Sequence, residues 1–290
     1  MEQHFEKKSW WNTIIEMPFS IKIAVLWISL MIFVGLFANF ITPYDYQEMD
    51  LLNRLKPPIW MEEGMWTHLL GTDDLGRDVL ARIIESIRIS LFVALAGTLI
   101  GATLGTSIGF AAAHFKGWVD HVIMILIDFQ AAVPFLILAL AVLAFFGNSF
   151  LLFVIVMGIY GWEQYARIVR GLALSANTHG YAVAAKTLGA SPIRLYFRHI
   201  LPNMASVIIV NMTLNFPETI LVETSLSFLG LGIQAPMTSL GNMVGFGRDY
   251  LLSAWWIALI PAIVIFLTSL AFSLLGDWFR DKLDPTLKGT

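Results

Sequence analysis

The sequence predicts an all-α integral membrane protein with six transmembrane helices. Hydrophobic residues make up 57% of the 290 residues and charged residues only 13%, and the mean hydropathy is +0.73. Soluble domains are nearer about 45–50% apolar and about 25% charged. Uncharged stretches of about twenty residues recur along the chain, long enough to cross a hydrocarbon core of roughly 30 Å as helices. We therefore expect one membrane domain with polar loops.

The composition and motifs argue against several functions. A net charge of −3 shows no basic excess for nucleic acid, and the absence of cysteine excludes disulfides and thiolate metal sites. The six histidines are scattered and no H-E-x-x-H motif is present. The run GTDDLGRD from Gly71 has P-loop glycine spacing but lacks the Lys-Ser/Thr pair. We expect a chain without enzyme activity, metal site or cofactor.

The amino-terminal part consists of a tail, an anchor and an acidic segment. Residues 1–22 form a polar to mixed tail, and residues 23–44 carry no charge and predict the first transmembrane helix. The sequence Ala38-Asn39-Phe40 is no small-x-small cleavage site, which favours an anchor over a cleaved signal peptide. Residues 45–88 contain nine acidic and five basic residues, which favours the outer side.

A permease-like core of five further helices is expected over residues 89–276. The second helix, Ile89 to Phe115, has glycines at four-residue spacing on one face, where another helix can approach its backbone closely. These glycines are Gly97, Gly101, Gly105 and Gly109. The third helix runs from about Val119 to Phe146 and contains Pro134. The fourth starts at Phe150 and continues to about Arg170, with Glu163 and Arg167 spaced as an i,i+4 pair.

The fifth helix, Met204 to Leu226, is apolar except for a polar stripe. Asn211, Asn215 and Glu218 fall on one face, which must meet protein or water. The sixth helix, Tyr250 to Gly276, begins near Trp255 and Trp256, which are typical of a membrane interface. Residues 277–290 form a polar tail.

Three carboxylates lie within the predicted spans, where a charge is costly and usually faces a cavity or partner. Glu218, on the polar stripe, is predicted to be functional. Glu223 lies off that stripe and is predicted to be structural. For Asp128, near the cytoplasmic end of its helix, a pairing with a base and a functional role are equally supported.

The segment 177–203 is a polar, helix-prone island between apolar runs. Asn177 and Thr178 are good N-cap residues for a short helix that ends at Gly189. Ser191 before Pro192 starts a second helix that runs to about His199, and Pro202 marks the start of the next segment. Two short helices would form a compact knob suited to a groove on another protein. The simpler interpretation is a basic loop that only sets topology.

The basic residues predict the orientation. With six spans and the amino terminus inside, twelve lysines and arginines lie on inner segments and six on outer ones. This distribution agrees with the positive-inside rule and places both termini and the segment 177–203 in the cytoplasm.

Four separated motifs carry a family resemblance over about Leu70 to Pro285. They are GTDDLGRDVLARI, YAVAAKTLGASPIRLYFRHILPN, SLSFLGLGIQAP and GDWFRDKLDP. They resemble the second permease subunit of the dipeptide, oligopeptide and nickel group of bacterial ATP-binding-cassette (ABC) importers. Val183 stands where this family usually has a glutamate, and Leu240 where it usually has a tryptophan.

The resemblance implies the type I ABC importer permease fold in the bacterial cytoplasmic (inner) membrane. The implied partners are a second homologous permease subunit, two ATPase subunits that bind ATP and magnesium, an extracytoplasmic substrate-binding protein and membrane lipid. The outer segments 45–88 and 229–253 would meet the binding protein. The translocation pathway is expected near Asn211, Asn215, Glu218 and Asp128.

The coupling to the ATPases is expected through the segment 178–203. The residues assigned to it are Tyr181, Val183, Ala184, Ala185, Lys186, Leu188, Gly189, Ala190, Ser191 and Arg194. Because Val183 replaces the acid, we expect apolar contacts of Ala184, Ala185 and Leu188 to dominate, with Lys186 and Arg194 secondary.

Di- or oligopeptides are the expected substrates, with nickel or a metal chelate as the alternative within the family. An alternative of another class is a self-contained secondary transporter or channel that uses Asp128 and Glu218.

Overall fold

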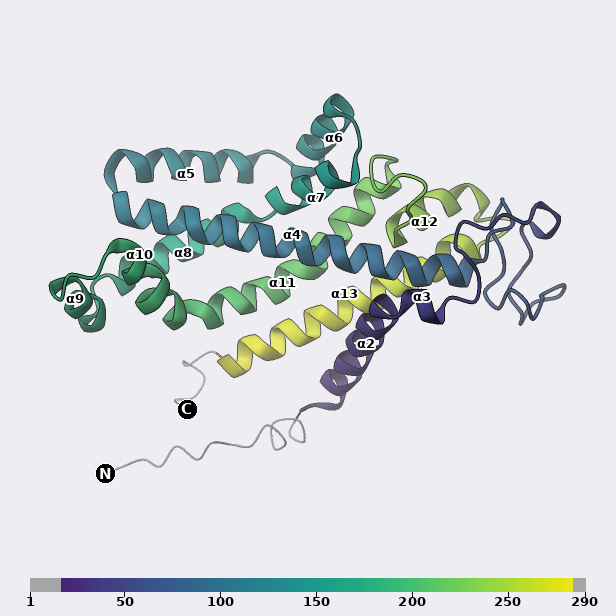
Figure 1. The fold of residues 1–290 in the computed structure, drawn as a ribbon, viewed down its shortest axis with the longest axis horizontal. Coiled ribbons are helices and arrows are strands. Elements are labelled where there is room, and N and C mark those ends of the chain that lie inside the picture. Colours follow the sequence, from purple (N-terminus) through teal and green to yellow (C-terminus); the bar gives the residue numbers. More distant parts are fainter. Residues whose placement is uncertain (1–16, 284–290) are drawn as a thin grey trace.

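The computed structural model describes residues 17–283, which are mostly helical (Figure 1). The longer helices are α2 (Phe19–Leu36), α4 (Val79–Phe115), α5 (Gly117–Ala132), α6 (Phe135–Phe146), α7 (Phe150–Ile159), α8 (Trp162–Ala176), α11 (Leu201–Phe228) and α13 (Trp256–Leu283). The shorter ones are α3 (Ala38–Ile41), η1 (Leu51–Asn53), α9 (Gly180–Thr187), α10 (Pro192–Arg194), η2 (Leu195–Ile200), α12 (Leu240–Gly247) and η3 (Arg248–Tyr250). Within the described range, the β pairing is one isolated bridge between Thr72 and Asp78.

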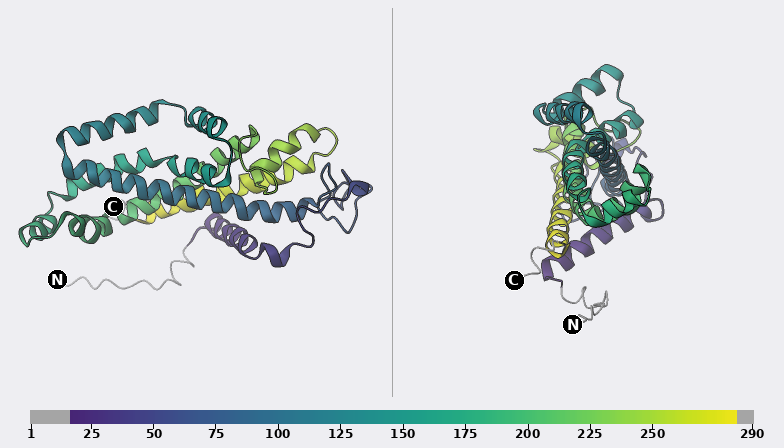
Figure 2. Two further views of the ribbon diagram at one scale, coloured as in Figure 1. Left: turned by 45° about the horizontal axis from the view of Figure 1, so that its top comes forward. Right: turned by 90° about the vertical axis from the view of Figure 1, so that its left-hand side faces the viewer.

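The helices form an elongated bundle with two distinct ends. Helix α4 runs through most of its length, with α9 and α10 at one end and α12 and the loops before α4 at the other (Figure 1). Helix α2 leaves the bundle at an angle, as both views in Figure 2 show. Four described helices are long and apolar enough to cross a membrane, or up to five if α5 and α6 count as one bent span. The all-α prediction is therefore confirmed, with fewer straight spans than expected.

The predicted third and fourth helices are each broken in two. Helices α5 and α6 meet at 90° across Val133 and Pro134. A residue before proline is pushed out of the α region, and Val133 has the extended angles φ −89° and ψ 124°. The break between α7 and α8 falls at Gly161, which takes the left-handed angles φ +77° and ψ −2°. One helix was predicted over each of these regions, and the structure divides each of them into two.

Three predicted boundaries also need correction. Helix α2 begins at Phe19 instead of residue 23. Helix α4 begins at Val79, ten residues before the predicted start, because the Asp78 carboxylate accepts a hydrogen bond from the backbone N–H of Ala81 at 2.7 Å. Helix α13 continues to Leu283, into the predicted polar tail.

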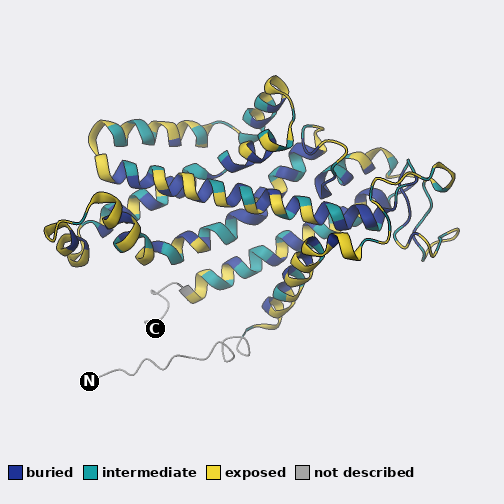
Figure 3. Ribbon diagram, viewed as in Figure 1, coloured by how far each residue is buried: buried dark blue, intermediate teal, exposed yellow. Residues whose placement is uncertain are grey.

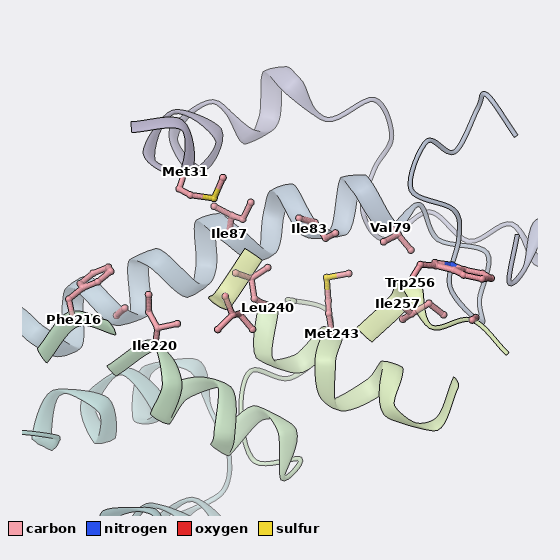
Figure 4. Close-up of a cluster of buried hydrophobic side chains, with 13 residues drawn as sticks. Met31, Val79, Ile83, Ile87, Phe216, Ile220, Leu240, Met243, Trp256 and Ile257 are labelled. Carbon is pink, nitrogen blue, oxygen red and sulfur yellow. The ribbon is translucent and has the colours of Figure 1, made fainter. Parts of the chain in front are cut away.

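A core of apolar side chains joins α4, α11, α12 and α13 near the α12 end of the bundle (Figure 4). Trp256 belongs to this core, with only 3% of its surface exposed, and its indole N–H donates to the Thr72 carbonyl at 3.1 Å. The expected position of Trp256 at a lipid interface is therefore wrong. Its ring instead fixes the outer segment to α13.

The four spaced glycines of α4 lie against α7 and α8. A Cβ atom placed on Gly101 would lie 2.9 Å from the Tyr160 carbonyl oxygen, and one on Gly109 would lie 2.7 Å from that of Ala166. Gly97 and Gly105 make equally close approaches to the same pair of helices. Bare backbone on α4 thus lets α7 and α8 pack directly against it.

Candidate functional site

The segment 177–203 folds as the expected pair of short helical pieces, which we call the knob. Gly189 has φ +79°, the left-handed conformation that glycine adopts freely, and it separates α9 from α10. The Ser191 hydroxyl accepts a hydrogen bond from the backbone N–H of Arg194 at 3.4 Å, and Pro192 occupies the first turn of α10. The sequence therefore located this turn and the second helix start.

The start of the first helix was predicted wrongly. His179 is the N-cap residue of α9 and makes no capping hydrogen bond with its side chain. The Thr178 hydroxyl instead donates to the Ser175 carbonyl at 2.7 Å, and the Asn177 amide donates to the Tyr196 hydroxyl at 3.2 Å. These two side chains tie the end of α8 to the knob.

The knob continues into α11 without a break. The second helix was expected to end at about His199, yet residues Pro192–Phe228 form one helical run that passes through the π-helical turn Leu195–Ile200. In this turn the backbone N–H of Leu201 bonds to the Tyr196 carbonyl, and Pro202 falls in the first turn of α11, where a missing N–H costs little. The second half of the knob and α11 are therefore parts of one continuous helical run.

The outer surface of the knob is exposed (Figure 3), and it carries apolar side chains beside polar ones. Leu188 and Ile193 have 87% and 74% of their surfaces exposed, and Val183 has 46%. The other exposed residues of the predicted coupling set are Tyr181, Ala184, Lys186, Gly189, Ser191 and Arg194, whereas Ala190 is half-buried. Ala185 is buried in a cluster with residues of α8 and η2, so its expected role as a docking contact is wrong.

The polar stripe on α11 is divided between buried and exposed positions. Asn215 is buried, with 5% of its surface exposed, while Glu218 is exposed and accepts a hydrogen bond from the Tyr160 hydroxyl at 3.4 Å. Asn211 donates to the Val207 carbonyl of its own helix at 2.8 Å. Glu218 is therefore the exposed acid of the stripe.

Asp128 is paired with a base from another helix. Its carboxylate lies 2.8 Å from the Arg167 guanidinium, and both side chains are more than half exposed. The predicted pairing of Arg167 with Glu163 is replaced by this contact from α5 to α8. Of the two roles considered for Asp128, the structure therefore favours pairing.

Sequence reasoning missed the neighbours of Glu218 on the broken helix. Tyr160, Glu163 and Tyr165 lie on either side of Gly161 and surround the stripe from α7 and α8. They are more than fifty positions away in the chain, and helical periodicity relates only residues of one helix. The sequence signal that could have pointed to these neighbours is the polar group that directly follows an apolar run, Trp162-Glu163-Gln164-Tyr165.

Glu223 is the centre of a buried hydrogen-bond network, consistent with its predicted structural role. Its carboxylate is fully buried and accepts from the hydroxyls of Ser239 at 2.7 Å and Ser227 at 2.8 Å. Ser90 donates from α4 at 3.4 Å and in turn accepts from the backbone N–H of Leu240 at 3.1 Å. One side chain thus connects α4, α11 and the start of α12.

The outer segment has a defined fold and is not a phosphate cradle. Asp73 is fully buried and accepts hydrogen bonds from the backbone N–H groups of Leu75 and Arg77, at 2.9 Å each, and from the Arg77 and Arg82 guanidinium groups. An anion would have to displace this carboxylate.

At the surface, the hydrogen bond from Asn53 lowers the pKa of the Asp50 carboxyl. Among the described residues, no group of three His, Asp or Glu side chains is placed to hold a metal.

Comparisons with known proteins agree on one family. A family model described as "Binding-protein-dependent transport system inner membrane component" matches residues 101–289. The chain is 39% identical over 264 residues to a di/tripeptide transport system permease protein DppC of Pseudomonas aeruginosa, covering 91% of this chain and 87% of that protein. It is also 39% identical over 268 residues to a glutathione transport system permease protein GsiD of Pectobacterium atrosepticum, covering 91% and 86%.

A third relative and one solved structure extend these matches. A dipeptide transport system permease protein DppC of Haemophilus influenzae is 36% identical over 266 residues, covering 92% of this chain and 90% of that protein. A crystal structure of an amino acid ABC transporter with histidines matches with a TM-score of 0.54 at 20% identity, covering 70% of this chain and 95% of that chain. The last match supports the fold.

Proposed function

Because the chain belongs to the family of binding-protein-dependent transport system inner membrane components, and is similar there to the DppC-type permeases, we propose that it is a permease subunit of an ATP-driven importer of di- or oligopeptides. The observation that carries this proposal is the knob, which presents Leu188 and Ile193 to solvent and is continuous with α11. An apolar projection of this kind fits a cleft on a partner protein.

The proposed topology has six crossings with both termini in the cytoplasm of a bacterium. Helices α2, α4, α11 and α13 and the bent pair α5–α6 supply five crossings. Helices α7 and α8 supply the sixth, because together they lead from the α12 end back to the knob (Figure 1). At 1.5 Å per residue they span about 40 Å, enough for the bilayer despite the break at Gly161. The membrane is the bacterial inner membrane, as the description of the matching family states for its members.

The proposed division of labour assigns no catalysis to this chain. Two ATPase subunits bind ATP and magnesium and receive the knob, a second permease subunit completes the pathway, and an extracytoplasmic binding protein delivers the solute to the outer segments. The coupling contacts are the exposed knob residues, above all Leu188 and Ile193. The pathway runs along the face that carries Asn211 and Glu218, because exposed polar groups at membrane depth need water or protein as neighbours.

A charge on the knob tests the proposal. We expect Leu188→Glu to lower ATP hydrolysis stimulated by the binding protein at least about tenfold, because docking would bury an unpaired carboxylate. The side chain is exposed in the chain alone, so folding and membrane insertion should be unchanged. The measurement is ATPase activity of the reconstituted importer, with co-purification of the ATPases as the assembly readout.

Lys116→Glu provides the matched control. It places the same acid on an exposed position at the end of α4, outside the knob, and should leave stimulation at the wild-type level. Normal stimulation in Leu188→Glu would contradict the docking role. Solute uptake in cells that lack the companion ATPases would instead support the self-contained transporter.

A further inference from the structure

A small polar site lies where the break between α7 and α8 faces the middle of α11. Tyr160 and Glu163 flank Gly161, and the Tyr160 hydroxyl reaches Glu218 on α11. A Cβ atom on Gly161 would lie 3.5 Å from the Asn215 side-chain oxygen, so Asn215 points at the break. The break thus brings Tyr160 and Gly161 against Glu218 and Asn215 of α11, and Glu163 follows two residues after Gly161 on α8.

Several polar atoms at this point have no hydrogen-bond partner among the described residues. They are the Asn215 oxygen, one Glu163 carboxylate oxygen and the Tyr165 hydroxyl. Asn215 and Tyr165 are 5% and 2% exposed. Buried polar atoms are nearly always paired in folded proteins, and an unpaired one indicates a missing water, ion or ligand. The Asn215 and Glu163 oxygens are acceptors, whereas the Tyr165 hydroxyl can donate or accept, so two of the three atoms need a donor.

Neither the Glu163 nor the Glu218 carboxylate is a partner in the ion pairs described for residues 17–283. Arg167 acts on Glu163 from a distance, but its direct contact is with Asp128 at 2.8 Å. The described contact of Glu218 is the neutral Tyr160 hydroxyl. A carboxylate at membrane depth in such surroundings would be stabilised by a cation.

We propose that Glu218, with Glu163 and Asn215, forms a subsite for the ammonium group of the passing solute. This inference rests on the proposed import function and adds the chemistry that is recognised. An ammonium group carries three N–H donors, which suit the Glu218 carboxylate, the Asn215 oxygen and the free Glu163 oxygen. Peptides with a free amino terminus have such a group. The acid is exposed on the pathway face, so the contact forms and breaks as the solute moves.

The test measures uptake by the complete importer in proteoliposomes, with a mixed pool of radiolabelled di- and tripeptides that carry free amino termini. We expect Glu218→Gln to lower peptide transported per ATP hydrolysed about ten- to hundredfold, the usual contribution of a charge-assisted hydrogen bond. Glu218→Lys should lower it further by repulsion, and Glu218→Asp should stay within about threefold of wild type because the charge is kept.

ATPase stimulation and the conservative variant separate recognition from structure. Stimulation by the loaded binding protein is measured in the same proteoliposomes and reports whether each variant assembles with the ATPases. Asp281→Asn, an exposed acid near the end of α13, is the matched control and should transport normally. Wild-type transport in Glu218→Gln, or an equal loss in Glu218→Asp, would overturn the subsite. Absence of ATP-dependent uptake by the wild-type importer would overturn the proposed function itself.

Discussion

At the scale of single residues, the two glutamates of α11 have opposite environments although they are five positions apart. Glu218 is exposed beside a single phenol, whereas Glu223 is enclosed by three hydroxyl groups from three segments. A buried carboxylate is tolerated when its oxygens accept several hydrogen bonds. This difference separates an acid available to a solute from one that holds helices together.

Glu223→Ala should lower the free energy of unfolding by about 2–4 kcal/mol. The change leaves the Ser227 and Ser239 hydroxyls without their acceptor and opens a cavity where α4, α11 and α12 meet. Glu223→Gln keeps one acceptor oxygen and should lose less. Thermal unfolding of the detergent-solubilised protein measures both variants. Glu218→Gln, whose side chain is exposed, is the control, and equal melting temperatures for Glu223→Ala and Glu218→Gln would contradict the structural role.

At the scale of elements, the knob depends on one backbone conformation. Gly189 has φ +79°, which proline with its fixed φ near −65° cannot adopt. Gly189→Pro should therefore redirect α10 relative to α9 and abolish ATP hydrolysis stimulated by the binding protein, while the α4–α8 packing keeps the chain inserted. Reconstituted ATPase activity, with membrane insertion measured in parallel, checks this outcome.

Gly180→Pro is the matched control for this prediction. Gly180 is the first residue of α9, where proline is favoured, and His179 before it already has the extended angles φ −74° and ψ 146° that precede proline. Nothing lies within 4 Å of a Cβ atom at Gly180. This variant should keep normal stimulation. Loss of stimulation in both variants would mean that the knob tolerates no proline at all, independent of the turn at Gly189.

Local signals predicted the elements better than they predicted their joints. Ser191 and Pro192 marked the real start of α10, and Gly189 marked the real end of α9. Each of these signals stabilises a helix end without a partner from elsewhere in the chain. Pro134 and Gly161 are also residues that can break a helix. Proline and glycine occur inside unbroken membrane helices as well, so hydrophobic periodicity alone could not show that the helices break there. Pro202 does lie in the first turn of α11, but the π-helical turn before it joins α10 to α11, and no local signal predicted that continuity. The partners of Glu218 required knowledge of which helices are neighbours.

At the scale of the whole molecule, the proposed topology places Leu188 and Leu252 on opposite sides of the membrane. Their side chains are 87% and 104% exposed. The chain contains no cysteine, so Leu188→Cys and Leu252→Cys each introduce one unique thiol. A membrane-impermeant maleimide should label the first only in inside-out vesicles and the second only in right-side-out vesicles.

The same labelling reports on assembly. In the presence of the ATPase subunits, labelling at Leu188→Cys should fall at least about tenfold, because docking removes the thiol from solvent, and labelling at Leu252→Cys should not change. Labelling of both thiols from the same side would contradict the single crossing by α11 that the proposed topology places between them.

In the unbroken run Pro192–Phe228, the knob and Glu218 lie at very different distances from Glu223. At 1.5 Å per residue, Ile193 lies about 45 Å from Glu223, while Glu218 lies only about 8 Å from it. If the Glu223 network is the pivot, a tilt of about 10° would carry the tip of the knob through about 8 Å and move Glu218 by a little over about 1 Å. Under the proposed function, a large movement of the knob at the ATPases would therefore shift Glu218 by about half a hydrogen-bond length. Such a shift would release a bound ammonium group while α11 stays helical.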